Sequence, residues 1–205
     1  MAIGRPNSPN GTAGKATVIN ASELKKILRF IATGQHPERN KALMMCSHFL
    51  GLRAKELAAL KILDVFDGNT IKPMLRLYGA YTKNSKHRDT QLSNSKLREA
   101  LLEYVEFRKI QTCPSFDINA PLFISQKRTA FSPNSMVRVI KNIYVDAGFP
   151  EASSHSGRRS LITKLANNHV DINLIRQVAG HSSISTTQIY INDNPDAVAN
   201  VLATL

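Results

Sequence analysis

The last quarter of the chain carries side chains whose types and order could do chemistry. His155 and Arg158 stand three residues apart, His181 follows them, and Tyr190 comes nine residues after that histidine. Arg53 precedes this group. A guanidinium binds phosphate through paired hydrogen bonds and stays charged at physiological pH, so both arginines suit the negative charge that grows on an attacked phosphodiester. The set predicts that the phenol of Tyr190 attacks a DNA phosphodiester.

Such an attack needs proton transfers. A free tyrosine has a pKa of about 10, so Tyr190 requires a base or a strongly positive site. His155 is the candidate base, because an unperturbed histidine titrates near ~6.5, and His181 is a third donor to the phosphate. The leaving 5′-oxygen needs a proton in return. Lys83 is the candidate acid for this step, and Lys86, in the same turn, competes with it.

Four blocks carry these residues and resemble a known family. They read Gly51-Leu52-Arg53-Ala54-Lys55-Glu56-Leu57, Thr82-Lys83-Asn84-Ser85-Lys86-His87-Arg88, His155-Ser156-Gly157-Arg158, and Gly180-His181-Ser182-Ser183-Ile184-Ser185-Thr186-Thr187-Gln188-Ile189-Tyr190. In this order they resemble the tyrosine recombinase (phage integrase) family, above all its Xer-type and small integrase members. The match runs from about Ser22 to Leu205.

The resemblance implies a role for each matching residue. It gives Tyr190 as the nucleophile of a 3′-phosphotyrosyl intermediate and implies that no cofactor or metal is needed. It favours Lys83 over Lys86 as the acid and gives Lys86 a phosphate contact. The activating groups that it implies are Arg53, Lys83, His155, Arg158 and His181.

Two positions depart from the family pattern. The family usually has leucine where this chain has Gly157 and where it has Ala179. A glycine near a helix start costs roughly 1 kcal/mol relative to alanine. We therefore expect a looser local geometry around Arg158.

Glu56 lies three residues after Arg53, which places both on one face of a helix. We expect this carboxylate to orient the guanidinium. An ordinary surface ion pair is the alternative.

Other basic residues are predicted to contact DNA. Lys86 and Arg88 belong to the hairpin block, and Arg138 and Lys141 share one face of a helix whose other face is apolar. A charged face that is merely solvated is the alternative for that helix. The formal net charge of +12 and the pI near 10.0 fit a polyanionic partner.

Composition also limits the class of protein. Cys46 and Cys113 lack the spacing of a zinc site or a disulfide framework. No apolar run is long enough to span a bilayer, and the first residues do not resemble a secretory signal. We expect a cytoplasmic, nucleoid-associated protein without a membrane partner.

The elements that position these residues are mainly helical. Residues 1–20 are predicted to be a flexible arm, and residues 21–205 one catalytic domain with no separate core-binding domain evident. Short strands between 62 and 92, with turns at 67–69 and 83–86, indicate a small antiparallel sheet. Residues 112–131 are expected to be irregular, and a short turn precedes Tyr190. The predicted helices, the first with Ser22 as its N-cap, run over 22–31, 38–50, 53–60, 94–111, 132–147, 158–168, 172–179 and 195–205.

These features predict a tyrosine recombinase catalytic-domain fold and a site-specific recombinase that integrates, excises, inverts or resolves duplex DNA. The alternatives are type IB topoisomerase-like relaxation and a DNA-binding regulator with a silent active site. The resemblance implies a homo-oligomer, dimer to tetramer, on DNA. Its tail, with Val198, Val201, Leu202 and Leu205 on one stripe, would dock into a neighbouring protomer, and packing in cis is the alternative. Accessory DNA-bending proteins are further possible partners.

Overall fold

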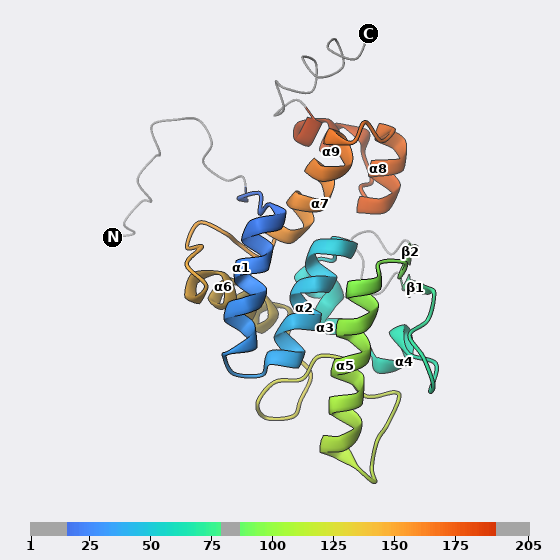
Figure 1. Cartoon of the computed structure of the whole chain (residues 1–205). Helices are drawn as coiled ribbons and strands as arrows, with labels where there is room; N and C mark the ends of the chain where they lie inside the picture. Colours follow the sequence, from blue (N-terminus) through green and yellow to red (C-terminus); the bar gives the residue numbers. More distant parts are fainter. Residues whose placement is uncertain (1–15, 79–86, 192–205) are drawn as a thin grey trace, which may run out of the picture.

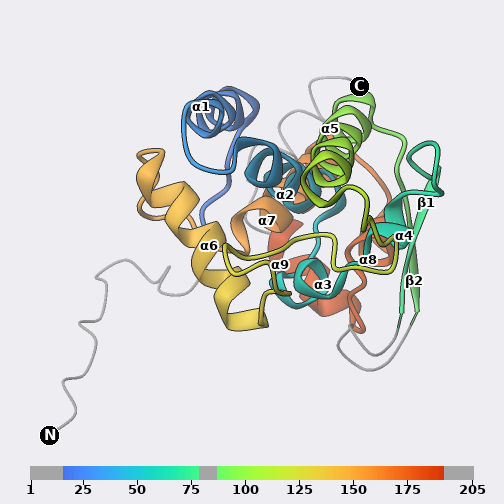
Figure 2. The same ribbon diagram turned by 90° about the horizontal axis from the view of Figure 1, so that it is seen from below.

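The computed structural model describes residues 16–78 and 87–191, apart from the side chains of Tyr190 and Ile191. In this part of the chain, helices pack around a central helix, and a two-stranded sheet lies at one edge (Figure 1, Figure 2). This arrangement confirms the predicted fold class. The elements are α1 (Ala21–Ala32), α2 (Pro37–Leu50), α3 (Ala54–Ala59), α4 (Ile62–Val65), β1 (Met74–Leu77), β2 (Arg88–Gln91), α5 (Ser95–Thr112), α6 (Pro133–Asp146), α7 (Ser156–Asn167), α8 (Ile172–Ala179) and α9 (Ile184–Ile191).

The central helix is α2. It is buried on all sides between Ala42 and His48, and it packs against α1, α3, α5 and α7. A helix that is apolar all round belongs in a core. It ends at Gly51, whose φ of 59° is the left-handed conformation that favours glycine. The sequence predicted both the helix and this end.

The start of α1 differs from the prediction. Asn20, not Ser22, caps the helix: its side chain accepts the backbone N–H groups of Ser22 at 2.9 Å and Glu23 at 3.0 Å. The Glu23 carboxylate accepts the N–H of Asn20 in return, at 2.8 Å. This reciprocal pair is a capping box, and it fixes the helix start two residues earlier than expected.

The sheet is smaller than expected. β1 and β2 pair antiparallel, with Leu77 opposite Arg88, and the predicted hairpin turn at 83–86 lies outside the described residues. The prediction of strand from Ile62 onward was wrong, because α4 forms there first. The Asp64 carboxylate accepts the backbone N–H of Lys61 at 2.8 Å, which stabilises a helical turn.

α8 and α9 lie at the top of Figure 1, and α7 runs from α2 up to them. α7 packs against α2 with its first half, and α7, α8 and α9 pack against one another around Ile162, Ile175 and Ala179. The short turn expected before Tyr190 is in fact α9. Its β-branched and hydroxyl residues are weak helix formers, so that packing rather than propensity stabilises it.

Other expectations have mixed outcomes. Residues 112–131 contain no helix or named strand beyond the end of α5, as predicted. The expected helix at 195–205 lies outside the described residues. Within the described ranges, none of the helices has the length and apolar character to cross a membrane.

Candidate active site

Arg53 and Glu56 meet at the start of α3. Arg53 is the residue before the first turn, and the Glu56 carboxylate accepts its backbone N–H at 2.7 Å and its Nη1 at 3.1 Å. The Glu56 side chain is 0% exposed, whereas that of Arg53 is 27% exposed. The buried carboxylate excludes an ordinary surface pair. It fixes the guanidinium while leaving part of it open to solvent.

Arg88 shares the same carboxylate. Its Nη2 donates to Glu56 Oε2 at 3.2 Å, and its Nη1 donates to the carbonyl of Val178 in α8. The side chain is 8% exposed, and burial lowers its pKa against the opposing effect of Glu56. Arg88 therefore joins β2, α3 and α8 from inside the molecule. The protein interior holds its guanidinium, and the predicted DNA contact of Arg88 stays a prediction.

Gly180 makes room for this arginine. It ends α8 in the left-handed conformation, with φ of 63°. A Cβ at this position would stand 2.8 Å from Cδ of Arg88. Both the backbone conformation and the close approach require glycine before His181.

Arg158 bridges two helix ends. Its Nη1 donates to the Gly51 carbonyl at the end of α2, at 2.8 Å, and its Nη2 donates to the Ala179 carbonyl at the end of α8. The residue is 4% exposed. The C-terminal ends of helices carry partial negative charge, so these carbonyls stabilise the buried cation.

Gly157 makes the geometry around Arg158 tight, contrary to the expectation of a looser one. A Cβ at this position would lie 2.3 Å from Oγ of Ser47 and 2.9 Å from its carbonyl carbon and oxygen. The absence of a side chain lets the first turn of α7 lie directly on α2. The glycine thus fixes the position of Arg158 rather than loosening it.

Two histidines border this cluster. His155 precedes α7 and is exposed, and His181, 8% exposed, has Nδ1 at 2.9 Å from Oγ1 of the buried Thr187 in α9. Desolvation lowers the pKa of His155, and the charges of Arg158 and Arg53 lower it further. Desolvation and the charges of Arg158, Arg53 and Arg88 lower the pKa of His181 to about 4. Both imidazoles are therefore neutral at pH 7.

The same arginine charges act on both histidines, so Arg53, His155, Arg158 and His181 lie in one electrostatic site. α9 packs against α7 and α8 beside it, and its backbone carries Tyr190. A cluster of fixed cations and neutral imidazoles next to a tyrosine-bearing helix can bind a phosphodiester and move protons around it.

A family model described as the phage integrase family matches residues 17–196. The chain belongs to the phage integrase family. Tyrosine recombinase XerC of Pelobacter propionicus is 30% identical over 164 residues, which are 80% of this chain and 50% of the relative. A tyrosine recombinase of Agathobacter rectalis is 35% identical over 156 residues, which are 74% of this chain and 47% of the relative. The chain thus spans about half the length of these relatives.

Solved structures agree with this membership. The crystal structure of XerA recombinase has a TM-score of 0.73 and 25% identity, and the likeness covers 92% of this chain and 65% of that one. XerH site-specific recombinase bound to its difH substrate in a pre-cleavage complex has a TM-score of 0.65 and 26% identity, covering 85% and 50%. The predicted catalytic-domain fold of the phage integrase family is confirmed.

The other predicted site residues have different outcomes. Lys83, Lys86 and the side chain of Tyr190 are outside the described part of the chain. Arg138 is exposed on α6, where a phosphate contact stays a prediction. Lys141 is used differently: its amine donates to the carbonyl of Ala152 at 2.9 Å and to that of Pro150. It anchors the loop that leads to His155, which argues against a DNA contact.

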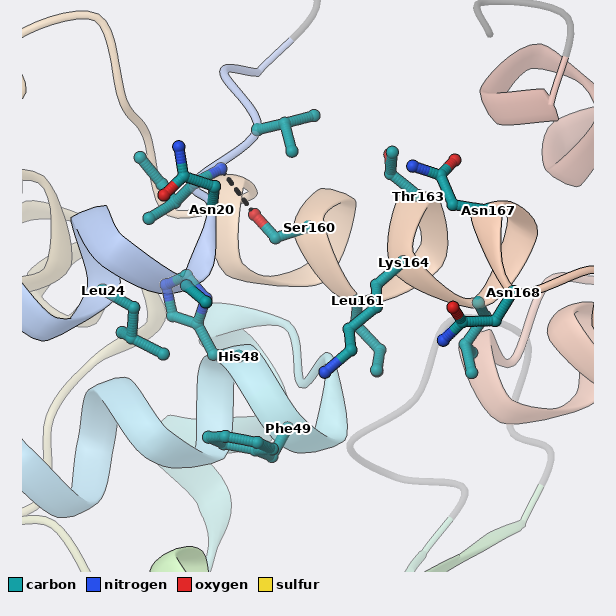
Figure 3. A pocket seen from close by; sticks show the side chains of 14 residues that line it. Asn20, Leu24, His48, Phe49, Ser160, Leu161, Thr163, Lys164, Asn167 and Asn168 are labelled. Carbon is teal, nitrogen blue, oxygen red and sulfur yellow. Dashed lines mark hydrogen bonds between the residues drawn. The ribbon is translucent and has the colours of Figure 1, made fainter. Parts of the chain in front are cut away.

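Sequence reasoning passed over two residues near this phage integrase site. Thr187 is 0% exposed and holds His181. His48, for which no role was predicted, contacts the hydroxyl of Tyr144 and lines a cavity of about 560 Å³ between α1, α2 and α7 (Figure 3). Thr187 stands in the terminal block without a predicted role, and His48 lies in no motif, so only the tertiary structure identifies them.

Proposed function

We propose that this chain is the catalytic part of a site-specific DNA recombinase that cleaves and rejoins duplex DNA through Tyr190. The observation that carries the proposal is the convergence of Arg53, Arg158, His155 and His181 on one site beside α9. This convergence joins residues of three separate motifs. It supports strand cleavage better than DNA binding alone, because a regulator with a silent site needs no such set.

In the proposed reaction, the phenol oxygen of Tyr190 attacks the scissile phosphorus. The new bond is a 3′-phosphotyrosine, the bond to the 5′-oxygen breaks, and the freed 5′-hydroxyl of the partner strand later reverses the step. Arg53 and Arg158 stabilise the non-bridging oxygens, where negative charge grows. Because the phosphotyrosyl bond conserves the energy of the phosphodiester, rejoining needs no nucleotide cofactor.

Proton transfer follows from the states of the histidines. His155 is neutral, so it can take the phenolic proton of Tyr190. His181 is also neutral and donates one N–H to the phosphate if its Nδ1 accepts from Thr187. Lys83 protonates the leaving 5′-oxygen in this proposal, with Lys86 contacting a phosphate. Glu56 and Arg88 position Arg53 without touching the substrate.

The assembly is also part of the proposal. Dimers to tetramers on duplex DNA, with the tail beyond 195 docked into a neighbour, would bring two duplexes together in the cytoplasm at the nucleoid. Accessory DNA-bending proteins would assist. Deleting residues 195–205 should leave a folded protein that binds DNA but forms no higher-order complex in a gel-shift assay. If the shortened chain unfolds or loses DNA binding, the tail packs in cis.

Covalent capture tests the activity. The protein is mixed with a library of sheared genomic duplexes from its host, denatured in detergent, and the DNA that remains attached is sequenced. Wild type should retain a defined sequence through Tyr190, and Tyr190→Phe should bind the same DNA without an adduct. Capture without sequence preference, with relaxation of supercoiled plasmid and no strand exchange, would indicate the topoisomerase-like alternative. DNA binding with no adduct would indicate a silent site.

A further inference from the structure

The first turn of α7 rests on two buried side chains that the proposed reaction does not use. Tyr144 of α6 is 0% exposed and His48 of α2 is 7% exposed. The Tyr144 hydroxyl lies 2.9 Å from Nε2 of His48. The backbone N–H of Gly157, the second residue of α7, also faces this hydroxyl and opposes the rise that burial causes in the pKa of Tyr144. Tyr144 therefore links three helices at one point.

The direction of these contacts follows from the groups available. Burial lowers the pKa of His48 to about 4, so its ring is neutral at pH 7 and can accept at Nε2. A phenol has one proton, so Tyr144 donates to His48 and accepts from Gly157. A buried chain in which each polar group has a partner is rigid, and removing one member leaves the others unsatisfied.

These hydrogen bonds reach the first turn of α7, next to two of the candidate catalytic residues. Arg158 follows Gly157 directly, His155 lies two residues before it, and His155 makes no side-chain capping bond of its own to α7. Gly157 already lies against Ser47, the neighbour of His48, with no space for a Cβ. The first turn of α7 thus packs closely against α2 and contacts α6 through the hydroxyl of Tyr144. Figure 3 shows His48 on the cavity wall near Leu24 of α1.

We propose that Tyr144 and His48 are positioning residues for strand cleavage: their hydrogen-bonded pair fixes the first turn of α7 so that His155 and Arg158 meet the scissile phosphate. This inference rests on the proposed function. The pair acts through the backbone of Gly157 and touches no substrate. Misplacement of a catalytic group by about 1 Å can cost about 100-fold in rate, so a loosened turn should appear in the rate and not in DNA affinity.

The test compares two buried tyrosines. Tyr144→Phe removes the linking hydroxyl, and Tyr104→Phe is the matched control, because Tyr104 is equally buried, at 1% exposed, and its hydroxyl faces Arg108 and Ile124 rather than α7. Single-turnover adduct formation, the Kd for the same duplex and the thermal midpoint are measured on a sequence that the wild type captures. Tyr144→Phe should cleave about 10- to 100-fold more slowly with Kd changed less than about twofold. Tyr104→Phe should cleave as wild type does.

Variants at His48 separate the loss of the hydrogen bond from a general loss of folding. His48→Gln retains an acceptor near Nε2 and should keep most of the rate, whereas His48→Leu should slow cleavage in the same way as Tyr144→Phe. The double variant should be no slower than Tyr144→Phe, because that variant already removes the contact that His48→Leu removes. Wild-type rates in Tyr144→Phe and His48→Leu, or losses that Tyr104→Phe shares, would overturn the inference alone. A wild-type protein that forms no adduct would overturn the proposed function as well.

Discussion

Glu56 and Arg53 form an ion pair whose carboxylate is fully buried and whose guanidinium is 27% exposed. The same carboxylate also holds Arg88, which is 8% exposed. Glu56 therefore does more than balance one charge. It connects a partly open cation, which can meet a ligand, to a second cation that stays inside.

Glu56→Gln should destabilise the protein and slow cleavage. The amide leaves Arg88 buried without a carboxylate, and breaking a buried pair costs about 3–5 kcal/mol. Urea denaturation measures the loss. Asp89→Asn is the control, because it breaks the Arg76–Asp89 pair, whose side chains are 56% and 39% exposed, and exposed pairs contribute about 0–1 kcal/mol. Equal losses in the two variants would contradict the role given to Glu56.

Mild acid should destabilise the fold through two histidines. The pKa values of His48 and His181 are each lowered to about 4. The unfolded chain binds protons near ~6.5 while the folded chain does not, so stability is complete above that pH and falls as the pH drops towards 4. Between pH 8 and pH 5 each histidine should cost on the order of 2 kcal/mol. His181→Gln should flatten this dependence in urea titrations, and an unchanged dependence in that variant would contradict the prediction.

The rate of cleavage should be maintained to a lower pH than a histidine base with an ordinary pKa would allow. Partial desolvation and the charges of Arg158 and Arg53 lower the pKa of His155 although its side chain is exposed, so the ring stays neutral as the pH falls through its usual value. Single-turnover rates of adduct formation, measured from pH 8 down to pH 5, should decline only below ~6.5. A decline centred at or above that value would argue against His155 as the base.

Gly157→Ala should destabilise the protein even though alanine is the better helix former. The new Cβ would overlap Oγ and the carbonyl of Ser47, and overpacking costs about 1–3 kcal/mol. Gly34→Ala is the control, because its Cβ would meet nothing nearer than 3.6 Å. Thermal unfolding compares the two. Adding Ser47→Gly removes only the hydroxymethyl group, and the overlap of the new Cβ with the backbone of residue 47 remains. Thermal stability should therefore recover only in part. Full recovery would mean that the two helices have moved apart.

Lys83→Ala should be rescued by a duplex whose 5′-bridging oxygen is replaced by sulfur, because a thiolate leaves without a proton. The same duplex should not rescue Arg53→Ala, whose defect lies in charge stabilisation. Adduct formation on the two substrates gives the comparison. Rescue of Lys86→Ala instead would transfer the acid role to Lys86.

The sequence predicted what local patterns determine and missed what distant contacts determine. The ends of α2 and α5 follow from apolar runs and breakers, so their prediction needed no tertiary information. The burial of Arg88 depends on Glu56 and on Gly180, which are distant in sequence, and arginine alone indicates a surface. From helix propensity alone, Gly157 predicted a loose start of α7, whereas in the structure this glycine packs closely against Ser47 of α2. Helix propensity likewise failed at α9, which is stabilised by packing.

The way in which Arg158 is held has a consequence for the balance of charge. Carbonyl oxygens of Gly51 and Ala179 receive this guanidinium, and they stabilise it without cancelling its charge. Glu56 pairs with both Arg53 and Arg88, so positive side chains outnumber negative ones among these four residues. A phosphodiester brings one negative charge, and the five-coordinate phosphorus formed under attack brings about two. Positive groups around the phosphate therefore interact more strongly with the transition state than with the bound substrate, which lowers the barrier to cleavage.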